Sequence, residues 1–276
     1  MVERSSNFSL PERARLKLSK WVTRTFLRRP LAIDPPRALV SFSFDDFPAS
    51  AYRTGGAILE RHGVRGTYYA AFGLLGGESE GLAMMTTEDI MAVIANGHEL
   101  GCHTFSHVSC RYLNRQQLMR ELDNNLAAFA DLTGRPAWIS FSYPFGDITL
   151  TAKKLAGARF ITCRGTLNGL NYGTIDLAAL RSECLSSRRN PVERNLEQIE
   201  EAVRRRGWLH FFTHDVSEIP SLYGCTPEHL DVVVQAAVAA GCDVVTVGEA
   251  YRRLSSTTQE AMSEQVSITG SNKKHV

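Results

Sequence analysis

The sequence predicts an α/β protein, a (β/α) barrel of about seven strands that forms a single domain. From residue 38 onward, short apolar segments rich in β-forming residues alternate with helix-like segments. Such alternation is typical of a parallel sheet with buried strands, and seven or so units fit a barrel better than an open sheet. The length of 276 residues also suits one barrel, a fold of about 250 residues.

The elements follow one another along the chain with recognisable starts and ends. The expected strands are 38–44, 67–72, 99–103, 138–143, 160–163, 209–213 and 244–247, and the expected helices are 51–61, 87–95, 115–132, 191–206 and 227–240. Thr86 or Thr87 before Glu88 and Asp89, and Thr226 before Pro227, are typical helix starts. Glycines stand where helices should end, at Gly63, Gly97, Gly134, Gly207 and Gly241. The segment 175–185 has no clear assignment.

Three regions are expected: a basic helical extension with a linker at 1–36, the catalytic domain at 37–256 and a disordered tail at 257–276. The extension should form a helix with one apolar stripe, made by Leu18, Trp21, Val22 and Phe26 and ended by Pro30. Residues 1–30 carry a net charge of +6 and the remainder −4. The stripe either packs on the outside of the barrel or contacts a membrane surface, where basic residues suit anionic lipid.

The composition excludes several classes of protein. With 43% hydrophobic and 22% charged residues, the chain can form a sizeable core. A net charge of +2 speaks against a nucleic-acid-binding surface. The six scattered cysteines include no Cys-x-x-Cys pair and are interpreted as reduced, buried thiols. No apolar run reaches the roughly 18 residues of a membrane span, and no secretory signal is recognisable, which predicts a cytoplasmic protein.

Residues capable of chemistry stand where four of the expected strands end. They are Asp45-Asp46, His103 with His107, the turn Tyr143-Pro144-Phe145, and His214. The carboxyl ends of parallel strands in a barrel share one face, and active sites lie there. The sequence therefore predicts that these carboxylates and imidazoles meet at one rim.

A metal site is one interpretation of the first two groups. Adjacent carboxylates repel each other unless a cation or proton offsets them, although Asp46 could equally cap the following helix. The i, i+4 spacing of His103 and His107 puts both imidazoles on one face of a helix, as in many zinc sites, but such pairs also occur on surfaces. With Asp46 they would leave coordination positions open for water and substrate. Asp45 could then take a proton from the attacking water.

His214 and the proline turn would complete such a site. A histidine at the end of a very apolar strand is often simply buried, but facing a metal site His214 suits a general acid that protonates a leaving amine. The turn Tyr143-Pro144-Phe145 is expected to bind the substrate or its oxyanion, and it would place the N–H of Phe145 where it can stabilise an oxyanion. The ring of Phe145 could also serve only as a wall.

These residues resemble the NodB-homology polysaccharide deacetylases, carbohydrate esterase family 4, over roughly residues 38–254. The family's Thr-Phe-Asp-Asp block is similar to Ser43-Phe44-Asp45-Asp46, its His-Ser/Thr-x-x-His block to His103-Thr104-Phe105-Ser106-His107, and its Leu-x-His block to Phe212-Thr213-His214. The resemblance implies a distorted barrel, with Asp45 as the base and His214 as the acid. It also implies a divalent metal ion, expected to be Zn²⁺, on Asp46, His103 and His107.

The sequence departs from the family in two blocks. The third block usually reads Arg-x-Pro-Tyr/Phe, and its Arg steadies the catalytic Asp; here it reads Ser142-Tyr143-Pro144-Phe145. The Asp of the fourth block is not found. Related subfamilies carry a later Leu-Arg element, for which Leu180-Arg181 is the counterpart. We expect Arg181 to reach the space at Ser142 and pair with Asp45, the alternative being an ordinary surface arginine.

The leading hypothesis is a metal-dependent N-deacetylase that hydrolyses the acetamide of an N-acetylated amino sugar. Its substrate would be an oligo- or polysaccharide, such as a chitooligosaccharide, or a glycolipid precursor. Two alternatives remain open: a related C–N hydrolase of a small amide or formamido sugar, and a pseudoenzyme that binds glycan without turnover. The expected partner is thus a carbohydrate, and no nucleic acid is expected. The N-terminal helix could in addition make a weak contact with a membrane surface. No oligomeric state is indicated.

Overall fold

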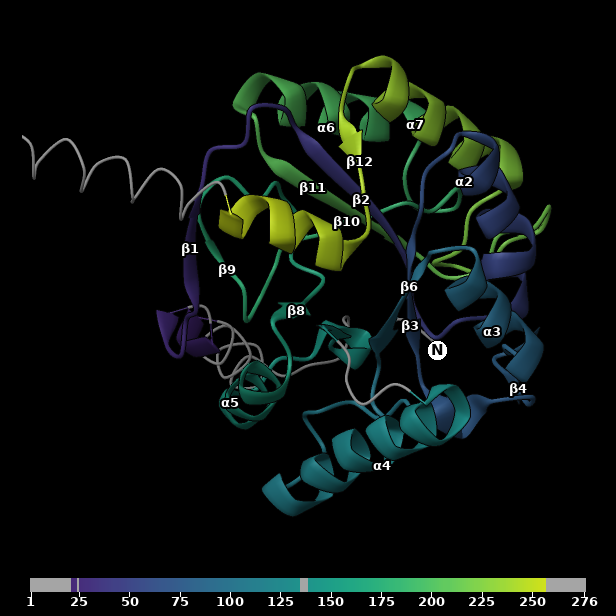
Figure 1. The fold of residues 1–276 in the computed structure, drawn as a ribbon, viewed down its shortest axis with the longest axis vertical. Coiled ribbons are helices and arrows are strands. Elements are labelled where there is room, and N and C mark those ends of the chain that lie inside the picture. The colour runs from purple at the N-terminus through teal and green to yellow at the C-terminus, as the bar shows by residue number, and fades with distance from the viewer. Residues whose placement is uncertain (1–20, 24, 135–138, 257–276) are drawn as a thin grey trace, which may run out of the picture.

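The computed structural model describes residues 21–256 except residue 24 and residues 135–138. Its main sheet runs in the order β10-β11-β2-β3-β6-β7-β8, with β12 beside β2 (Figure 1). All pairs in it are parallel. The strands are β2 (Leu39–Phe44), β3 (Thr67–Ala70), β6 (Glu99–Cys102), β7 (Ser140–Ser142), β8 (Thr162–Arg164), β10 (Glu183–Cys184), β11 (Trp208–Thr213) and β12 (Asp243–Val244). The predicted parallel α/β fold is therefore confirmed, with a barrel-like, distorted sheet.

The segment between Leu177 and Cys184 links the two ends of this sheet. Near its start, Leu180 N donates to Cys163 O at 2.8 Å, and Cys163 N donates to Leu177 O at 2.7 Å. Its end forms β10, which pairs with β11 through Glu183 and Phe211. Because the segment changes partner after a few residues, it never forms a long alternating strand. That is the physical reason why residues 175–185 gave no clear sequence pattern.

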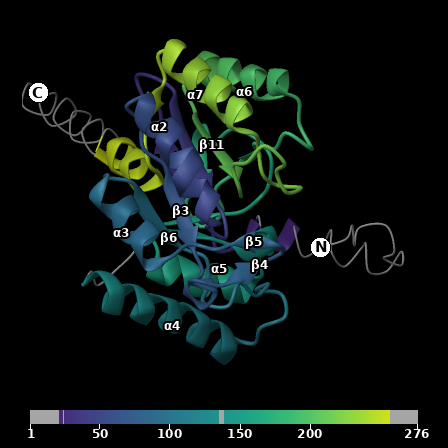
Figure 2. The same ribbon diagram turned by 90° about the vertical axis from the view of Figure 1, so that its right-hand side faces the viewer.

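Helices cover the outside of the sheet (Figure 2). They are α2 (Ala57–Arg61), which continues a π-helical segment η1 (Ala51–Gly56), α3 (Thr87–Ala95), α4 (Arg115–Thr133), α5 (Leu150–Arg159), α6 (Val192–Arg205) and α7 (Pro227–Ala239). The predicted starts are confirmed: the side chain of Thr86 accepts from Asp89 N, and that of Thr226 accepts from His229 N. Short elements lie between them: η2 (Phe72–Leu74), β4 (Glu78–Ser79), β5 (Leu82–Ala83) and η3 (Pro144–Gly146).

The core consists of two hydrophobic clusters. The larger fills the space between the sheet and the helices, with Phe42, Phe44 and Phe141 among its buried residues. The smaller surrounds Trp208 and includes Ile33 and Leu254. Ile33 belongs to β1 (Pro30–Ile33), which pairs antiparallel with β9 (Gly173–Asp176). Part of the predicted extension and linker is therefore a strand packed on the domain.

The described end of the N-terminal extension packs only in part. Residues 21–23 are helical, and Thr23 is buried where its carbonyl accepts from Lys153 Nζ at 2.7 Å. Trp21 and Phe26, however, are 58% and 51% exposed. The expectation that the whole stripe packs on the barrel is thus wrong for these two residues. Leu18 and the predicted tail 257–276 lie outside the described residues.

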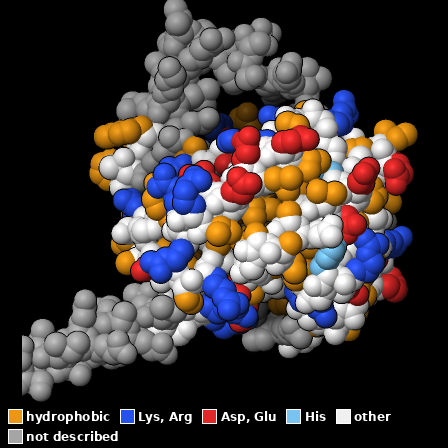
Figure 3. Space-filling model, turned by 90° about the horizontal axis from the view of Figure 1, so that it is seen from above, with side chains coloured by type: hydrophobic (Ala, Val, Ile, Leu, Met, Phe, Trp, Pro, Cys, Tyr) orange, Lys and Arg blue, Asp and Glu red, His pale blue; other side chains and the backbone are white. Residues whose placement is uncertain are grey.

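Other expectations about the surface and the thiols can be compared directly with the structure. All six cysteines are free, and five of them are buried, as predicted. On the side that carries α6 and α7, acidic and basic side chains are interspersed (Figure 3), so this face shows no concentration of positive charge. Among the described residues, no helix is both long and apolar enough to cross a membrane.

Candidate active site

The candidate site lies at the carboxyl ends of the strands, on loops with unusual backbone conformations. Five residues other than glycine have positive φ there: Asp46 (62°), Phe47 (60°), Thr104 (62°), His107 (51°) and Phe145 (58°). Such conformations are uncommon and tend to cluster at functional sites, where the surrounding structure enforces them. Loops from β2, β6 and β7 therefore hold side chains here at the cost of local strain.

Asp46, His103 and His107 converge in this region as predicted. The Nε2 atoms of His103 and His107 lie 3.2 Å and 2.9 Å from Asp46 Oδ1. One ligand atom from each of the three residues can be chosen so that all lie within 4.8 Å of one another. The three side chains thus present two imidazole nitrogens and a carboxylate oxygen to a common point.

The predicted helical arrangement of His103 and His107 is wrong. Residues 103–107 form a loop rather than a helix, and positive φ at Thr104 and His107 is incompatible with a helical turn. The two imidazoles meet because the loop after β6 folds back, with ring centroids 5.0 Å apart. The spacing identified the right residues through a different local geometry.

The three side chains fit a divalent metal ion. Asp46 Oδ1 is buried and has no hydrogen-bond partner among the described residues, which is costly unless a cation faces it. His103 Nδ1 donates to Ser142 O at 2.8 Å, so its Nε2 carries the lone pair that a metal needs. Burial raises the pKa of Asp46, but the imidazoles of His214, His103 and His107 lower it, and the pKa stays well below its ordinary value.

Asp45 pairs with Arg164. The Nη2 atom of Arg164, at the end of β8, contacts both carboxylate oxygens of Asp45 and the hydroxyl of Ser142. Arg164 is only 1% exposed, and its guanidinium lies over the rings of Tyr69 and Phe212. The residue that steadies Asp45 is therefore Arg164 of β8. This strand pairs with β7 in a register that places Arg164 beside Ser142.

The expected pairing of Arg181 with Asp45 is wrong. Arg181 is exposed, and its Nη1 donates to Asn168 O at 2.8 Å. Sequence reasoning missed Arg164 because the expected strand was ended at Cys163. A charged residue directly after an apolar strand, followed by Gly165, is the same signal that identified Asp45 and His214, so it could have been found.

His214 lies beside the group formed by Asp46, His103 and His107, at the end of β11. Its Nδ1 is 3.4 Å from Asp46 Oδ2, and its ring stacks on Tyr223 with centroids 5.3 Å apart. His214 N donates to Tyr223 O at 3.1 Å, which ties the histidine to the loop that follows it. The predicted meeting of His214 with the residues from β2 and β6 is thus present in the geometry.

The proline turn is divided between core and site. Tyr143 is buried, and its hydroxyl donates to Ala178 O at 3.0 Å, so its side chain does not face substrate as expected. Pro144 is also buried and shapes the turn. Phe145 is 43% exposed, and its ring centroid lies 4.6 Å from that of His107. Only Phe145 of this turn therefore presents its side chain to the site.

Comparisons with known proteins concern the family and the fold. The family model described as polysaccharide deacetylase matches residues 32–160. The predicted resemblance to the polysaccharide deacetylases is confirmed. No curated protein sequence matches the chain.

Three solved structures share the fold. The Xyl-CE4 domain of a multidomain xylanase from the hindgut metagenome of Trinervitermes trinervoides has 19% identity and a TM-score of 0.56, covering 79% of this chain and 91% of that one. A family 4 acetyl xylan esterase from Clostridium thermocellum, in complex with a cobalt ion, has 20% identity, a TM-score of 0.55 and coverages of 76% and 89%. The D285S mutant of the peptidoglycan deacetylase PdaC from Bacillus subtilis has 14% identity, a TM-score of 0.55 and coverages of 84% and 99%.

Proposed function

We propose that this chain is a metal-dependent N-deacetylase that hydrolyses the acetamide of an N-acetylated amino sugar in an oligo- or polysaccharide or a glycolipid precursor. The observation that carries the proposal is that the adjacent residues Asp45 and Asp46 have different partners. Asp46 faces two imidazoles, whereas Asp45 is held by a buried guanidinium. One carboxylate is thereby available to a cation and the other to a proton.

The residues have distinct roles in this proposal. A divalent ion, with Zn²⁺ as the first candidate, would be held by Asp46, His103 and His107 and would polarise the amide carbonyl and acidify water. Asp45, oriented by Arg164, accepts the proton of the attacking water. His214 donates a proton to the amine nitrogen as the C–N bond breaks.

Phe145 contributes the remaining group. No acceptor for its backbone N–H is found among the described residues, and its positive φ turns the chain sharply after Pro144. We assign this N–H to the oxygen of the tetrahedral intermediate, as an oxyanion donor. The ring of Phe145, next to His107, forms a wall for the sugar.

The test is acetate release by the purified protein, stripped of metal and reloaded with Zn²⁺ or Co²⁺. N-acetylglucosamine oligomers should be hydrolysed; O-acetylated xylooligosaccharides and a formamido sugar serve as competing substrates, because one structural relative is an acetyl xylan esterase. Asp45→Asn should lose turnover by about 10²–10⁴-fold, the usual contribution of a general base, and keep its metal. A protein that binds the oligomers but releases no acetate from any substrate would be a pseudoenzyme, and the proposal would fail.

We further propose that the N-terminal helix contacts the cytoplasmic leaflet of a membrane. Its support is the exposure of Trp21 and Phe26, next to a segment whose sequence is strongly basic. Basic residues near an anionic leaflet contribute about 1 kcal/mol each. Co-sedimentation with anionic vesicles at low salt, lost at high salt and weakened in Trp21→Ala, supports the contact. Absence of binding at low salt removes it.

A further inference from the structure

We propose that Arg189 forms a subsite for an anionic group on the substrate, a carboxylate or phosphate carried next to the acetylated sugar. This inference rests on the proposed function, since it names the class of glycan that the same site accepts. It depends on an arginine that the catalytic chemistry does not use. Arg189 is exposed and lies at the edge of the candidate active site.

A chain of ring contacts connects Arg189 to the site. Its guanidinium carbon lies 4.8 Å from the ring centroid of Tyr223. The same ring stacks on His214, whose Nδ1 is 3.4 Å from Asp46. A glycan whose acetamide lies at the site that His214 and Asp46 line would therefore pass Tyr223 and reach Arg189 with a neighbouring sugar residue.

The guanidinium is available to a ligand. An arginine stacked on an aromatic ring uses its flat face for the contact, which leaves its in-plane N–H groups free to form a fork around a carboxylate or phosphate. No carboxylate pairs with Arg189 among the described residues, whereas Arg111, on the loop after β6, is neutralised by Asp147 at 2.7 Å. Arg189 is therefore a positive charge without an internal counter-ion.

The loop that carries Arg189 is held in place from both sides. Ser186 Oγ donates to Leu222 O at 2.8 Å, which fastens the loop to the segment before Tyr223. Asn190 Nδ2 donates to Cys184 O at 2.6 Å. Arg189 is thus part of a fixed turn whose position relative to Tyr223 is determined by hydrogen bonds.

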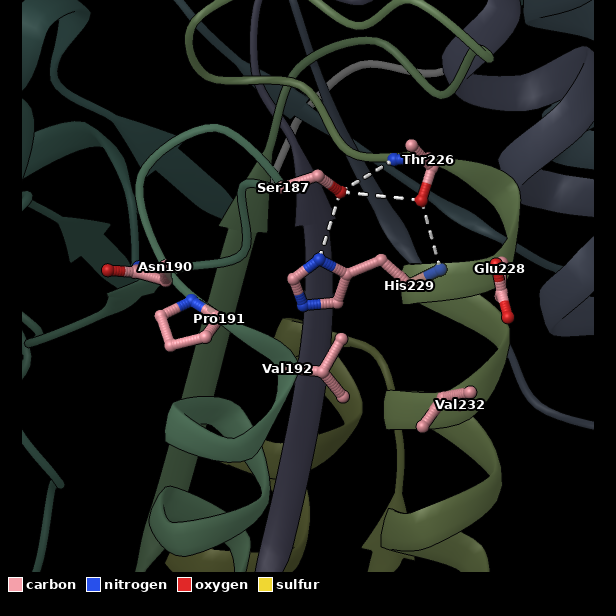
Figure 4. A pocket seen from close by; sticks show the side chains of 8 residues that line it. All are labelled: Ser187, Asn190, Pro191, Val192, Thr226, Glu228, His229 and Val232. Atoms are coloured by element: carbon pink, nitrogen blue, oxygen red, sulfur yellow. Dashed lines mark hydrogen bonds between the residues drawn. The ribbon is translucent and has the colours of Figure 1, made fainter.

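A pocket at the N-termini of α6 and α7 shows how the loop is anchored (Figure 4). Ser187 Oγ accepts from Thr226 N at 2.9 Å and donates to His229 Nδ1 at 2.9 Å. His229 Nε2 in turn donates to Asn195 Oδ1 at 2.9 Å. In this network Ser187 Oγ, Thr226 Oγ1 and both ring nitrogens of His229 all have partners. We therefore interpret the cluster as a clamp that fixes the loop carrying Arg189.

The chain supplies a matched control in Arg188. It is exposed, lies on the same turn and makes no ring contact or ion pair among the described residues. Arg188→Gln removes the same charge from the same surface without touching Tyr223. A general effect of surface charge would appear equally in both variants, whereas a subsite would appear only in Arg189→Gln.

The experiment measures hydrolysis and binding with three probes: an N-acetylglucosamine trimer, the same oligomer carrying a uronate carboxylate, and one carrying a phosphate monoester. Arg189→Gln should raise KM about five- to tenfold for the anionic probes and leave the neutral trimer unchanged, and Arg188→Gln should change neither. Arg189→Lys should recover only part of the effect, because lysine lacks the planar fork. The preference should decline with added salt.

Binding to the Asp45→Asn variant separates this proposal from the proposed function. If the unsubstituted protein hydrolyses no probe, but the anionic probes bind Asp45→Asn more tightly than the neutral trimer and lose this advantage when Arg189→Gln is added, the deacetylase proposal fails and the subsite stands. If the three probes bind with equal affinity, or if Arg188→Gln and Arg189→Gln behave alike, the subsite is wrong. The carboxylate and phosphate arms identify which anion is preferred.

Discussion

Asp45 and Glu99 are two carboxylates at opposite ends of the same parallel sheet. Asp45 follows the carboxyl end of β2 and is held by the cation Arg164. Glu99 begins β6, and its hydrogen-bond donors among the described residues are neutral: Ser140 Oγ at 2.5 Å, Gly248 N at 2.7 Å and Thr67 Oγ1 at 3.3 Å. Burial raises the pKa of Glu99, and these hydrogen bonds lower it without cancelling the increase.

The two ends of the sheet stabilise their carboxylates in different ways. At the carboxyl end, full charges are brought together and balanced by one another, which leaves groups that can bind a cation or move a proton. At the amino end, Glu99 receives the N–H of Gly248 and so holds the first turn of the helix at 247–256. Substitutions at the two ends should therefore have different effects on activity and stability.

The largest effect is expected at the three proposed metal ligands. His103→Ala and Asp46→Asn should both abolish metal binding and, with it, activity, because three protein ligands leave no replacement. His62→Gln, a partly exposed histidine paired with Asp231 at 2.7 Å, should change neither. Metal content measured by elemental analysis after dialysis decides: a normal zinc content in Asp46→Asn would contradict the site.

Arg164 should matter for positioning rather than for metal binding. Arg164→Met should lower kcat by about 100-fold, the effect of a small displacement of a reacting group, with little change in KM. Arg164→Lys keeps the charge but not the double contact, so it should restore part of kcat. Removing one partner of a buried pair also costs about 3–5 kcal/mol of stability.

Unfolding curves and metal analysis of the Arg164 variants must accompany the kinetics. A folded Arg164→Met protein with normal metal content and low kcat supports the role in orienting Asp45. If the kcat of folded, metal-loaded Arg164→Met were normal, and the loss of activity followed only the loss of stability, the arginine would be a structural residue only.

The smallest effect concerns Glu99 and the dependence of stability on pH. Above its ordinary pKa of 4.5, the unfolded chain loses this proton while the folded protein, in which the pKa is raised, keeps it. The folded state then binds more protons, so this group's contribution to stability falls as pH rises. Glu99→Gln does not titrate and should escape this decline.

The measurement is the difference in Tm between Glu99→Gln and the unsubstituted protein from pH 4.5 to pH 8. The difference should move in favour of the variant as pH rises, and each 1 kcal/mol corresponds to about 2–4 °C in a chain of this size. A difference that is constant over this range would show that Glu99 does not carry a raised pKa.

The parallel α/β fold, the helix starts near Thr86 and at Thr226, and the convergence of Asp46, His103 and His107 could all be predicted from the sequence. Each of these depends on signals within a few residues: apolar runs, capping side chains, and polar residues directly after a strand. For the same reason Asp45, Asp46, His103, His107 and His214 could be expected at one rim, because strand ends in a parallel sheet share an edge.

Which side chain lies next to each of these residues depends on the tertiary structure. Arg164 meets Asp45 across 119 positions of sequence because β7 and β8 pair in a register that puts Arg164 beside Ser142. Arg181 and Tyr143 were assigned wrongly, since one turns to solvent and the other into the core. Register and side-chain direction depend on the packing of the whole sheet, and local sequence patterns do not carry that information.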